Sequence, residues 1–170
     1  RGFAAFLAQW QGLRTFTGVD GLAAALDLLA GAPMAASAVE SLILPARVTD
    51  YRPEYLDELM SAGEIVWAGE RGTSTDGWIR LLPADAVADL APLPQPVSGL
   101  AAEVLSLMEP GAGWFARDLA EQLEVPADAL TEALWELVWA GHITNDTLAP
   151  LRARLGGERP GVRRTHRPRV

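Results

Sequence analysis

The sequence predicts a mainly helical α+β protein in which two similar helical modules follow one another. Three observations predict this fold class. Apolar residues recur at a spacing of three or four through most of the chain, which is typical of helices packed on a core. Two β-prone segments, residues 65–67 and 77–82, flank a polar stretch suited to a hairpin tip. A segment of ten residues that begins at Leu56 recurs at Leu134, 78 residues later.

Four helices are expected within residues 1–90, the first module. Each is a run of apolar residues bounded by a capping residue, a glycine or a proline. These helices cover residues 3–13, 21–30, 36–44 and 54–62. Asp20 is the expected N-cap of the second helix, because its carboxylate can accept a hydrogen bond from the free N–H groups there. Pro53 stands at the first position of the fourth helix, where its missing N–H costs nothing.

The fourth helix leads into the predicted hairpin. Gly63 is expected to end the helix, because glycine readily adopts the left-handed turn that a helix end requires. Residues 65–67 and 77–82 then form two strands, and the Gly, Ser and Thr of residues 69–76 form the tip between them. Helix, glycine stop, strand, loop and strand is the order of a winged helix with its wing. We therefore expect a helical bundle with a short β-hairpin wing.

A proline-rich connector, residues 91–98, is the expected domain boundary. Residues 99–152 are expected to form a second winged-helix-like module in tandem with the first. Its predicted elements are helices over residues 100–108, 114–123 and 126–140 and a short strand over residues 142–145. Residues 153–170 carry few apolar residues and many arginines, so they are expected to form an Arg-rich tail or linker.

The internal repeat supports this tandem organisation. Residues 56–65 align with residues 134–143 without gaps, and six of the ten positions are identical. In both segments two leucines three apart face one core, a glycine ends the helix, and an isoleucine returns the chain as a strand. The alternative is that any helix-glycine-strand corner would share this pattern.

Charge is distributed unevenly along the chain. Residues 1–150 hold 7 Arg against 21 acidic residues, a net charge of −14, whereas residues 151–170 hold 7 Arg against Glu158 alone, a net charge of +6. Affinity for nucleic-acid phosphates comes mostly from cation contacts. The acidic body therefore argues against strong independent DNA binding, and the basic tail favours it only locally.

Composition also excludes several classes of protein. No run of 18 apolar residues is present, so no membrane span is expected, and the N-terminus lacks the pattern of a signal peptide. Cysteine is absent, which excludes disulfides and thiolate metal sites, and a cytoplasmic location is expected. The chain begins at Arg1 without an initiator Met, so we expect a fragment of a longer protein.

The sequence contains no recognisable catalytic set. His142 and His166 are the only histidines, no P-loop pattern is present, and no carboxylate pair has calcium-loop spacing. We therefore expect no catalytic residue, no metal site and no cofactor in this chain. Residues 145–147, Asn-Asp-Thr, are expected to form a turn or a helix cap rather than a binding site.

The candidate nucleic-acid contacts lie mainly around the predicted wing. Arg71 is placed at the wing tip among glycine and hydroxyl residues, where further donors can assist it on a phosphate. The complete set of candidates is Arg47, Arg52, Arg71, Thr73, Ser74, Arg80, Trp135 and Trp139. The four arginines are expected to cluster at one edge of the first module. Glu54, Asp57 and Glu58 on the recognition helix would repel a duplex, so major-groove reading is not expected.

Two pairs of tryptophans carry expectations of their own. Trp67 and Trp78 are expected to face each other across the hairpin and brace it. Trp135 and Trp139 are four residues apart on the last predicted helix, where one can project outward. Such a tryptophan would stack on a base or pack on a neighbouring domain, and domain packing is the favoured reading.

Several unusual strings occur together in this chain. It has Ile-Leu-Pro-Ala-Arg-Val-Thr-Asp-Tyr at residues 43–51 and Leu-Asp-Glu-Leu-Met-Ser-Ala-Gly-Glu-Ile-Val-Trp at residues 56–67. In these strings the chain resembles the large helicase-related (Lhr) family. Further similar strings stand in the family's order at residues 6–11, 20–22, 134–147 and 149–152. The resemblance covers most of residues 3–152.

The resemblance implies a bacterial superfamily 2 ATP-dependent helicase that moves 3′-to-5′ on single-stranded DNA and unwinds DNA or RNA:DNA duplexes in DNA repair. In that family two RecA-like motor domains hold ATP and Mg²⁺. A winged helix and a large helical domain with winged-helix modules follow and close over the strand. This chain would be part of that helical domain, with the motor domains and single-stranded DNA or an RNA:DNA hybrid as partners. The motor motifs are absent, so the fragment alone is expected not to be an enzyme.

Two functional hypotheses follow from these observations. In the first, the chain is an accessory module whose wing and arginines guide a DNA strand, so that motor strokes become directional movement. In the second, the same modules are a scaffold that docks the motor to later domains and contacts no nucleic acid. A stand-alone winged-helix regulator is a third class, but it needs a dimerisation helix and a basic reading helix, and neither is found.

Overall fold

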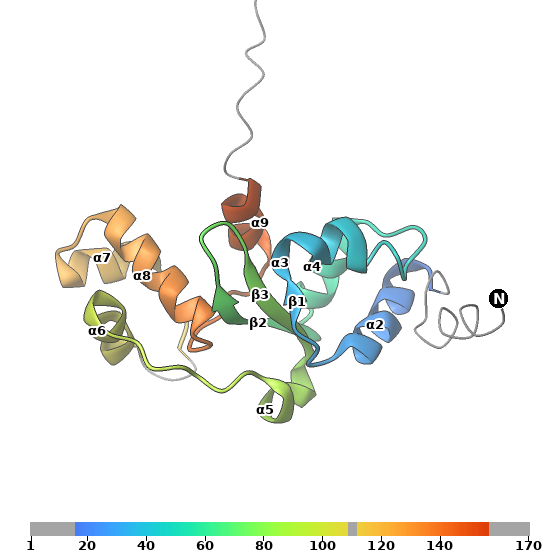
Figure 1. Cartoon of the computed structure of the whole chain (residues 1–170), viewed down its shortest axis with the longest axis horizontal. Coiled ribbons are helices and arrows are strands. Elements are labelled where there is room, and N and C mark those ends of the chain that lie inside the picture. The colour runs from blue at the N-terminus through green and yellow to red at the C-terminus, as the bar shows by residue number, and fades with distance from the viewer. Residues whose placement is uncertain (1–15, 109–111, 157–170) are drawn as a thin grey trace, which may run out of the picture.

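The computed structural model describes residues 16–108 and 112–156. Within these ranges the fold is mainly helical with one small antiparallel sheet, so the predicted α+β class is confirmed. Figure 1 shows the sheet at the centre, with helices of the first module on one side and helices of the second on the other. The helix predicted over residues 3–13 lies outside the described residues.

Helix α2, Gly18–Leu29, begins three residues before its predicted start at residue 21. Asp20 therefore lies in the first turn, and its prediction as the N-cap was wrong. The capping bond comes instead from Asp50, whose Oδ1 accepts a hydrogen bond from the Gly18 N–H at 2.9 Å. This bond is the main reason why the pKa of Asp50 lies below its usual value. A carboxylate from a distant loop thus completes the helix end.

The segment predicted as a helix over residues 36–44 is short and irregular. Strand β1, Met34–Ala35, leads into α3, Ala36–Ala38, and then a π-helical turn, Val39–Ile43, where one continuous helix was predicted. The Leu44 N–H donates to the Val39 carbonyl, five residues back, at 2.9 Å. Val39 and Leu44 are both fully buried, so the widened turn begins and ends in the core.

Helix α4, Pro53–Ser61, stands in the place of a recognition helix. Pro53 lies in its first turn, as predicted. Leu56, Leu59 and Met60 face the core. Gly63 follows with a φ of +73°, the left-handed conformation that ends the helix and turns the chain into the sheet.

The helix stop at Gly63 recurs at the end of α8, Ala127–Trp139, as the internal repeat predicts. Gly141 has a φ of +76°. The Glu64 N–H donates to the Leu59 carbonyl at 3.0 Å, and at the second site the His142 N–H donates to the Leu137 carbonyl at 3.0 Å. Both bonds span five residues and close the same type of helix end. The repeat therefore corresponds to a real structural equivalence up to the glycine.

The sheet has the strand order β1–β3–β2, and its neighbouring strands are antiparallel. Strands β2, Ile65–Gly72, and β3, Gly77–Pro83, form the predicted wing hairpin. Their register shifts between Gly69 and Arg71, a bulge that leaves Glu70 outside the pairing. Strand β1 was missed because two residues carry no alternating pattern.

Trp67 and Trp78 do not face each other across the hairpin, so that prediction was wrong. Trp67 lies opposite Leu81, whereas Trp78 lies opposite Arg71. Trp67 is fully buried, and Trp78 is half-buried near the outer end of the hairpin. The strand register follows from the positions of the bulge and the turn, which the spacing of two tryptophans does not reveal.

The remaining helices follow the hairpin in sequence. Their bounds are Ala84–Ala86 for a short 3-10 turn, Val87–Leu90 for α5, Gly99–Leu107 for α6, Ala116–Leu123 for α7, Ala127–Trp139 for α8 and Ala149–Gly156 for α9. Helices α6 and α7 both pack on α8. These three helices form the body of the second module.

The strand predicted over residues 142–145 is not formed, since the chain is irregular there. The Thr144 hydroxyl donates to the Trp67 carbonyl, and the Trp67 indole N–H donates to the Thr147 carbonyl at 3.1 Å. Side-chain hydrogen bonds thus hold this segment beside β2 in place of a strand ladder. Within the described residues the second module has no wing of its own.

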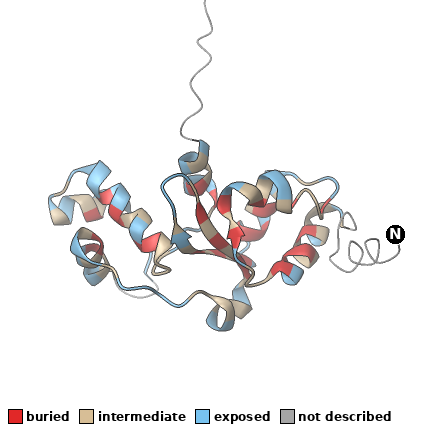
Figure 2. Cartoon of the chain, viewed as in Figure 1, coloured by how far each residue is buried: buried red, intermediate tan, exposed pale blue. Residues whose placement is uncertain are grey.

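Buried residues form two clusters, shown in red in Figure 2. The second cluster is formed by α6, α7 and α8. The first cluster contains α2, α4 and the sheet, but it also contains Val138, Leu148 and Leu151. Leu148 and Leu151 are 2% and 1% exposed, so α9 returns to the first module and completes its core. None of the described helices is long and apolar enough to cross a membrane.

Candidate nucleic-acid interface

The outer part of the wing carries Arg71, Thr73 and Ser74, all of them exposed. The guanidinium carbon of Arg71 lies 5.8 Å from the centre of the Trp78 ring, an arrangement that supports a cation on an aromatic face. The Thr73 hydroxyl donates to the backbone carbonyl of Asp76 at 2.9 Å and closes the tip. The exposed end of the wing is therefore an ordered turn that carries one cation.

Asp76, beside the tip, is held by hydrogen bonds from three donors. Its carboxylate accepts from the Ser37 hydroxyl at 2.6 Å, the Ser37 N–H at 3.1 Å and the Gly77 N–H at 2.8 Å. Burial raises the pKa of Asp76, but these hydrogen bonds outweigh it, and the pKa lies below its usual value. The bonds to Ser37 also tie the wing tip to α3.

Arg80, the second wing candidate, is engaged within the protein. Its guanidinium donates to both oxygens of Glu70, at 2.8 and 3.1 Å, and to the Leu90 carbonyl at 3.1 Å. The hydrogen bonds from Arg80 hold the pKa of Glu70 below its usual value. The negative charge of Glu70 at the bulge is thus neutralised by Arg80. Arg80 also links the wing to α5 through the Leu90 carbonyl.

Arg47 and Arg52 lie outside the wing, in the segment between the π turn and α4, where Arg52 is the residue before the first turn of α4. The Arg47 Nη1 donates to the Ile43 carbonyl at 3.0 Å. Arg52 donates to the Tyr55 hydroxyl at 2.8 Å, and its guanidinium carbon lies 4.6 Å from the centre of that ring. The structure groups Arg71 with Arg80 on the wing. Across the described ranges, no hydrogen bond or ion pair joins either of them to Arg47 or Arg52.

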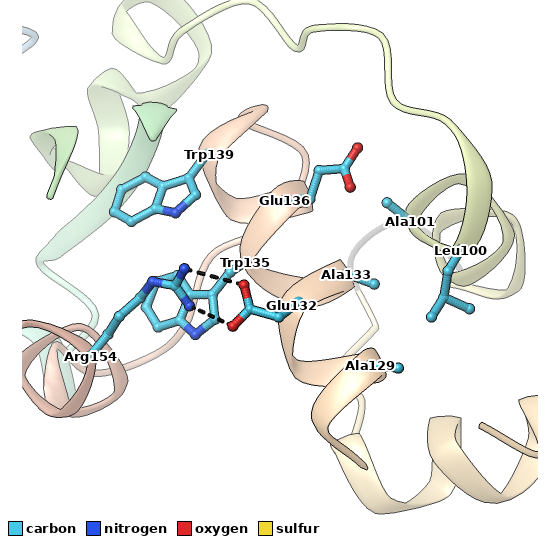
Figure 3. Close-up of a pocket in the computed structure, with 9 residues that line it drawn as sticks. All are labelled: Leu100, Ala101, Ala129, Glu132, Ala133, Trp135, Glu136, Trp139 and Arg154. Atoms are coloured by element: carbon cyan, nitrogen blue, oxygen red, sulfur yellow. Dashed lines mark hydrogen bonds and ion pairs between the residues drawn. The ribbon is translucent and has the colours of Figure 1, made fainter. Parts of the chain in front are cut away.

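Trp135 and Trp139 pack between the two modules. Their rings are stacked at a centroid distance of 5.4 Å. The guanidinium of Arg154 lies over the Trp135 ring, 4.9 Å from its centre, and Arg154 also pairs with Glu132 at 3.2 Å (Figure 3). Trp139 lies against the wing at Gly72 and Gly77. Both rings are therefore used in packing within the chain, Trp135 under Arg154 and Trp139 on the wing.

A groove of about 390 Å³ runs over α8 beside these tryptophans. Figure 3 shows Leu100 and Ala101 of α6 on the opposite side of α8 from the two rings. Glu132 and Glu136 are exposed at its rim. Their carboxylates disfavour a phosphate, so the groove is a poor binding site for a nucleic-acid backbone.

The outward face of α4 is acidic, as the sequence predicts. Glu54 and Glu58 are exposed there. Asp57 is held by Arg152 of α9 at 2.8 Å. The sequence did not predict that Arg152 would link the modules. The only signal at this position was that residues 149–152 resemble a string of the Lhr family. The face of α4 that a winged helix would place in a groove therefore repels phosphates.

The described residues contain no group of three His, Asp or Glu side chains that could hold a metal ion. The His142 Nε2 lies 2.7 Å from the Gln95 carbonyl, which gives this ring nitrogen a hydrogen-bond partner. Asn145 accepts hydrogen bonds from the Thr147 N–H at 3.1 Å and from its hydroxyl at 3.2 Å, which forms the expected turn. These residues have structural roles.

Comparisons with known proteins agree with the fold. A family model described as a large helicase-related protein, winged-helix domain, matches residues 1–84. The chain is 44% identical, over 180 aligned residues, to a protein of Mycolicibacterium smegmatis named Lhr helicase/probable uracil glycosylase. It is 37% identical over 168 residues to the Lhr helicase/uracil glycosylase of Escherichia coli. These alignments cover 98% and 91% of this chain.

The chain spans only 12% and 11% of the length of these two relatives. The match to residues 1–84 ends just after β3, so it coincides with the winged helix and its wing. The relatives extend the similarity through α9. Their agreement with the winged-helix match confirms the predicted resemblance to the large helicase-related family, to whose winged-helix domain residues 1–84 belong.

Proposed function

We propose that this chain is an accessory strand-guiding module of an Lhr-type helicase, in which the wing contacts the backbone of a nucleic-acid strand. Arg71 carries the proposal. It is exposed on the wing, and the carboxylates beside it, Glu70 and Asp76, are already held by Arg80 and Ser37. A cation whose acidic neighbours are bound elsewhere is available to a phosphate.

The proposed setting is a larger enzyme. RecA-like motor domains outside this chain would hold ATP and Mg²⁺ and move 3′-to-5′ along single-stranded DNA or the DNA strand of an RNA:DNA hybrid, in DNA repair in the cytoplasm. The names of the two relatives, both helicases, support this setting. This chain would supply no ATPase chemistry. Its part is to keep the strand on one track while the motor moves.

The electrostatics set the scale of this contact. The wing offers one exposed arginine on a body whose first 150 residues carry a net charge of −14. One phosphate contact contributes about 0.7 to the slope of log affinity against log salt for a single strand. The wing alone therefore binds a strand weakly, with an affinity measurable at low salt, and in the full enzyme it guides a strand that the motor already holds.

Salt-dependent binding tests the proposal. Arg71→Ala is compared with Arg117→Ala, which removes the same charge from an exposed site on α7, away from the wing. Binding to a fluorescent oligothymidine is measured across a salt series, and the series is repeated on a chain ending at residue 156. Arg71→Ala lowers the slope by about 0.7, and Arg117→Ala leaves it unchanged. Equal effects of the two variants, or none, would contradict strand guidance by this wing.

A second candidate function is interdomain docking without nucleic-acid contact. The observation that favours it is the use of Trp135, Trp139 and Arg80 inside the protein, which leaves few of the candidates free. In the full-length enzyme, Arg71→Ala would then leave DNA-stimulated ATPase activity and unwinding intact. A loss of unwinding with ATPase activity retained would instead favour strand guidance.

A further inference from the structure

The indole ring of Trp139 lies against the wing at the last strand pair before the tip. Gly72 and Gly77 are cross-strand partners there, and neither has a side chain. A Cβ built on Gly72 would lie 2.6 Å from the Trp139 Cδ1, and a Cβ on Gly77 would overlap the six-membered part of the ring. The two glycines therefore allow one aromatic ring to lie across both strands of the hairpin.

The Trp139 ring also packs against a second indole ring. It is stacked on Trp135, with a centroid distance of 5.4 Å and an interplanar angle of 24°. Arg154 lies over the Trp135 ring, and Glu132 holds Arg154 through two hydrogen bonds at 3.2 and 3.3 Å (Figure 3). The wing backbone, two indole rings and a guanidinium thus form a continuous stack between the modules.

A second contact extends this packing toward the base of the wing. A Cβ on Gly69 would overlap the carbonyl oxygen of Val138, so the backbones of β2 and α8 touch. The bulge at Glu70 lies between the two contacts. Helix α8 therefore supports the hairpin on both sides of the point where its register changes.

The outer end of the hairpin needs such support. Strand β1 pairs only with Trp78 and Ile79 of β3, so beyond that point the wing is a two-stranded ribbon. An isolated two-stranded ribbon is marginally stable in water. Asp76 ties one side of the tip to Ser37, and Trp139 lies on the ribbon itself. The direction of the exposed wing residues therefore depends on Trp139.

We infer that Trp139 is a positioning residue for nucleic-acid contact: it sets the direction of the wing and thereby of Arg71 and the Trp78 ring. Arg71 lies opposite Trp78 and one residue before Gly72, so a change in the angle of the ribbon moves both. This inference rests on the proposed strand-guiding function. It also means that the second module acts on nucleic acid through the wing of the first.

The first test measures the wing itself and does not depend on the proposed function. Amide hydrogen exchange at residues 70–78 is followed in the full chain, in Trp139→Ala and in Trp139→Phe. Trp139→Ala raises exchange in these residues at least tenfold, while amides in α2 and α4 keep their protection; Trp139→Phe restores most of it. Unchanged wing exchange in Trp139→Ala would overturn the inference.

A control and a second variant keep this test decisive. Trp114→Ala removes an equal side chain from the second cluster and leaves wing exchange unchanged. Gly77→Ala displaces the ring from the wing side without removing it, and it raises exchange in the same residues as Trp139→Ala. A rise in Trp114→Ala equal to that in Trp139→Ala would mean that general loosening of the module is responsible, and the inference would be wrong.

The second test links the ring to binding. Affinity for fluorescent oligothymidine at low salt falls in Trp139→Ala and recovers in Trp139→Phe. The double variant Arg71→Ala with Trp139→Ala binds no more weakly than Arg71→Ala alone, because the ring acts through the arginine. Additive losses would overturn this role of Trp139. If Arg71→Ala alone has no effect on binding, the proposed function fails, and the exchange data still decide whether Trp139 holds the wing.

Discussion

The Nε of Arg152 lies 2.7 Å from the Oε2 of Glu40, although 112 residues separate the two in sequence. The same guanidinium reaches Asp57 at 2.8 Å, so α9 is joined to the π turn and to α4 at once. The Tyr51 hydroxyl donates to the other oxygen of Glu40 at 2.8 Å. Burial and this bond to a carboxylate raise the pKa of the Tyr51 phenol. One arginine thus anchors the last helix on the first module.

Removing this arginine should weaken the whole chain. Arg152→Met keeps most of the aliphatic side chain but leaves Glu40 and Asp57 without their cation. We expect a loss of about 1–2 kcal/mol in the free energy of unfolding, less than for a fully buried pair because the site is partly exposed. Urea denaturation measures it, with Arg117→Met, on a largely exposed side chain, as the matched control. Equal midpoints for Arg152→Met and the unmodified chain would show that the link is unimportant.

Ending the chain early should damage the first module. Leu148 and Leu151 are buried in the first cluster, although the matching family model ends at residue 84. A chain that stops at residue 147 leaves an apolar gap over α4 and β2. We expect a lower melting temperature and poorly dispersed amide signals for residues 18–83 in NMR spectra. A chain with native-like signals and an unchanged melting temperature would refute this expectation.

Contact between α8 and β2 can be tested at one backbone position. Gly69→Ala places a methyl group on the Val138 carbonyl, which is backbone and cannot move aside cheaply. A loss of at least about 2 kcal/mol is expected. Gly113→Ala is the matched control, because no atom lies within 4 Å of its added Cβ. Similar unfolding curves for the two variants would mean that the interface between α8 and β2 can adjust to the added methyl group at little cost in free energy.

The two equivalent helix ends should respond alike to the same change. Gly63 and Gly141 have φ values of +73° and +76°, which an alanine adopts at a cost of about 1 kcal/mol or slightly more. Gly63→Ala and Gly141→Ala should therefore lower stability by similar amounts, as thermal denaturation can measure. A loss confined to one of them would show that the repeat is less equivalent in energy than in geometry.

Acid should weaken the ion pair at the base of the wing. The pKa of Glu70 is lowered in the folded state by Arg80, so the pair adds stability above the unfolded value of about 4.5. That stability is lost as pH falls from there through the lowered folded value. The difference in unfolding free energy between the unmodified chain and Glu70→Gln should therefore shrink below about pH 4.5. A difference in unfolding free energy that is constant from pH 7 to pH 3 would show that the Glu70–Arg80 ion pair is not its source.

Local signals in the sequence predicted much of this fold. Pro53, Gly63 and Gly141 specify backbone conformations by themselves, so the helices that they bound were predicted to within a few residues. The hairpin was predicted because β-prone segments flank a polar tip. The fold class and the family resemblance both depended on such local patterns.

Features that depend on distant partners were missed. Asp50 caps α2 from 32 residues away, and no spacing rule connects it with Gly18. Residues 142–145 resemble a strand, but side-chain bonds between Thr144 and Trp67 take the place of a ladder. At the candidate interface, the sequence identified arginines but not their partners. Only the fold shows that Arg80 is paired with Glu70 while Arg71 is exposed.

The return of α9 to the first core has a consequence for the evolution of this protein. A winged helix that is complete after its wing can be copied, moved or recombined as an independent cassette. Here the closing helix is encoded more than sixty residues after β3. A recombination crossover between β3 and α9 would separate the first module from the helix that completes its core. The first core stays complete only when β3 and α9 are inherited together.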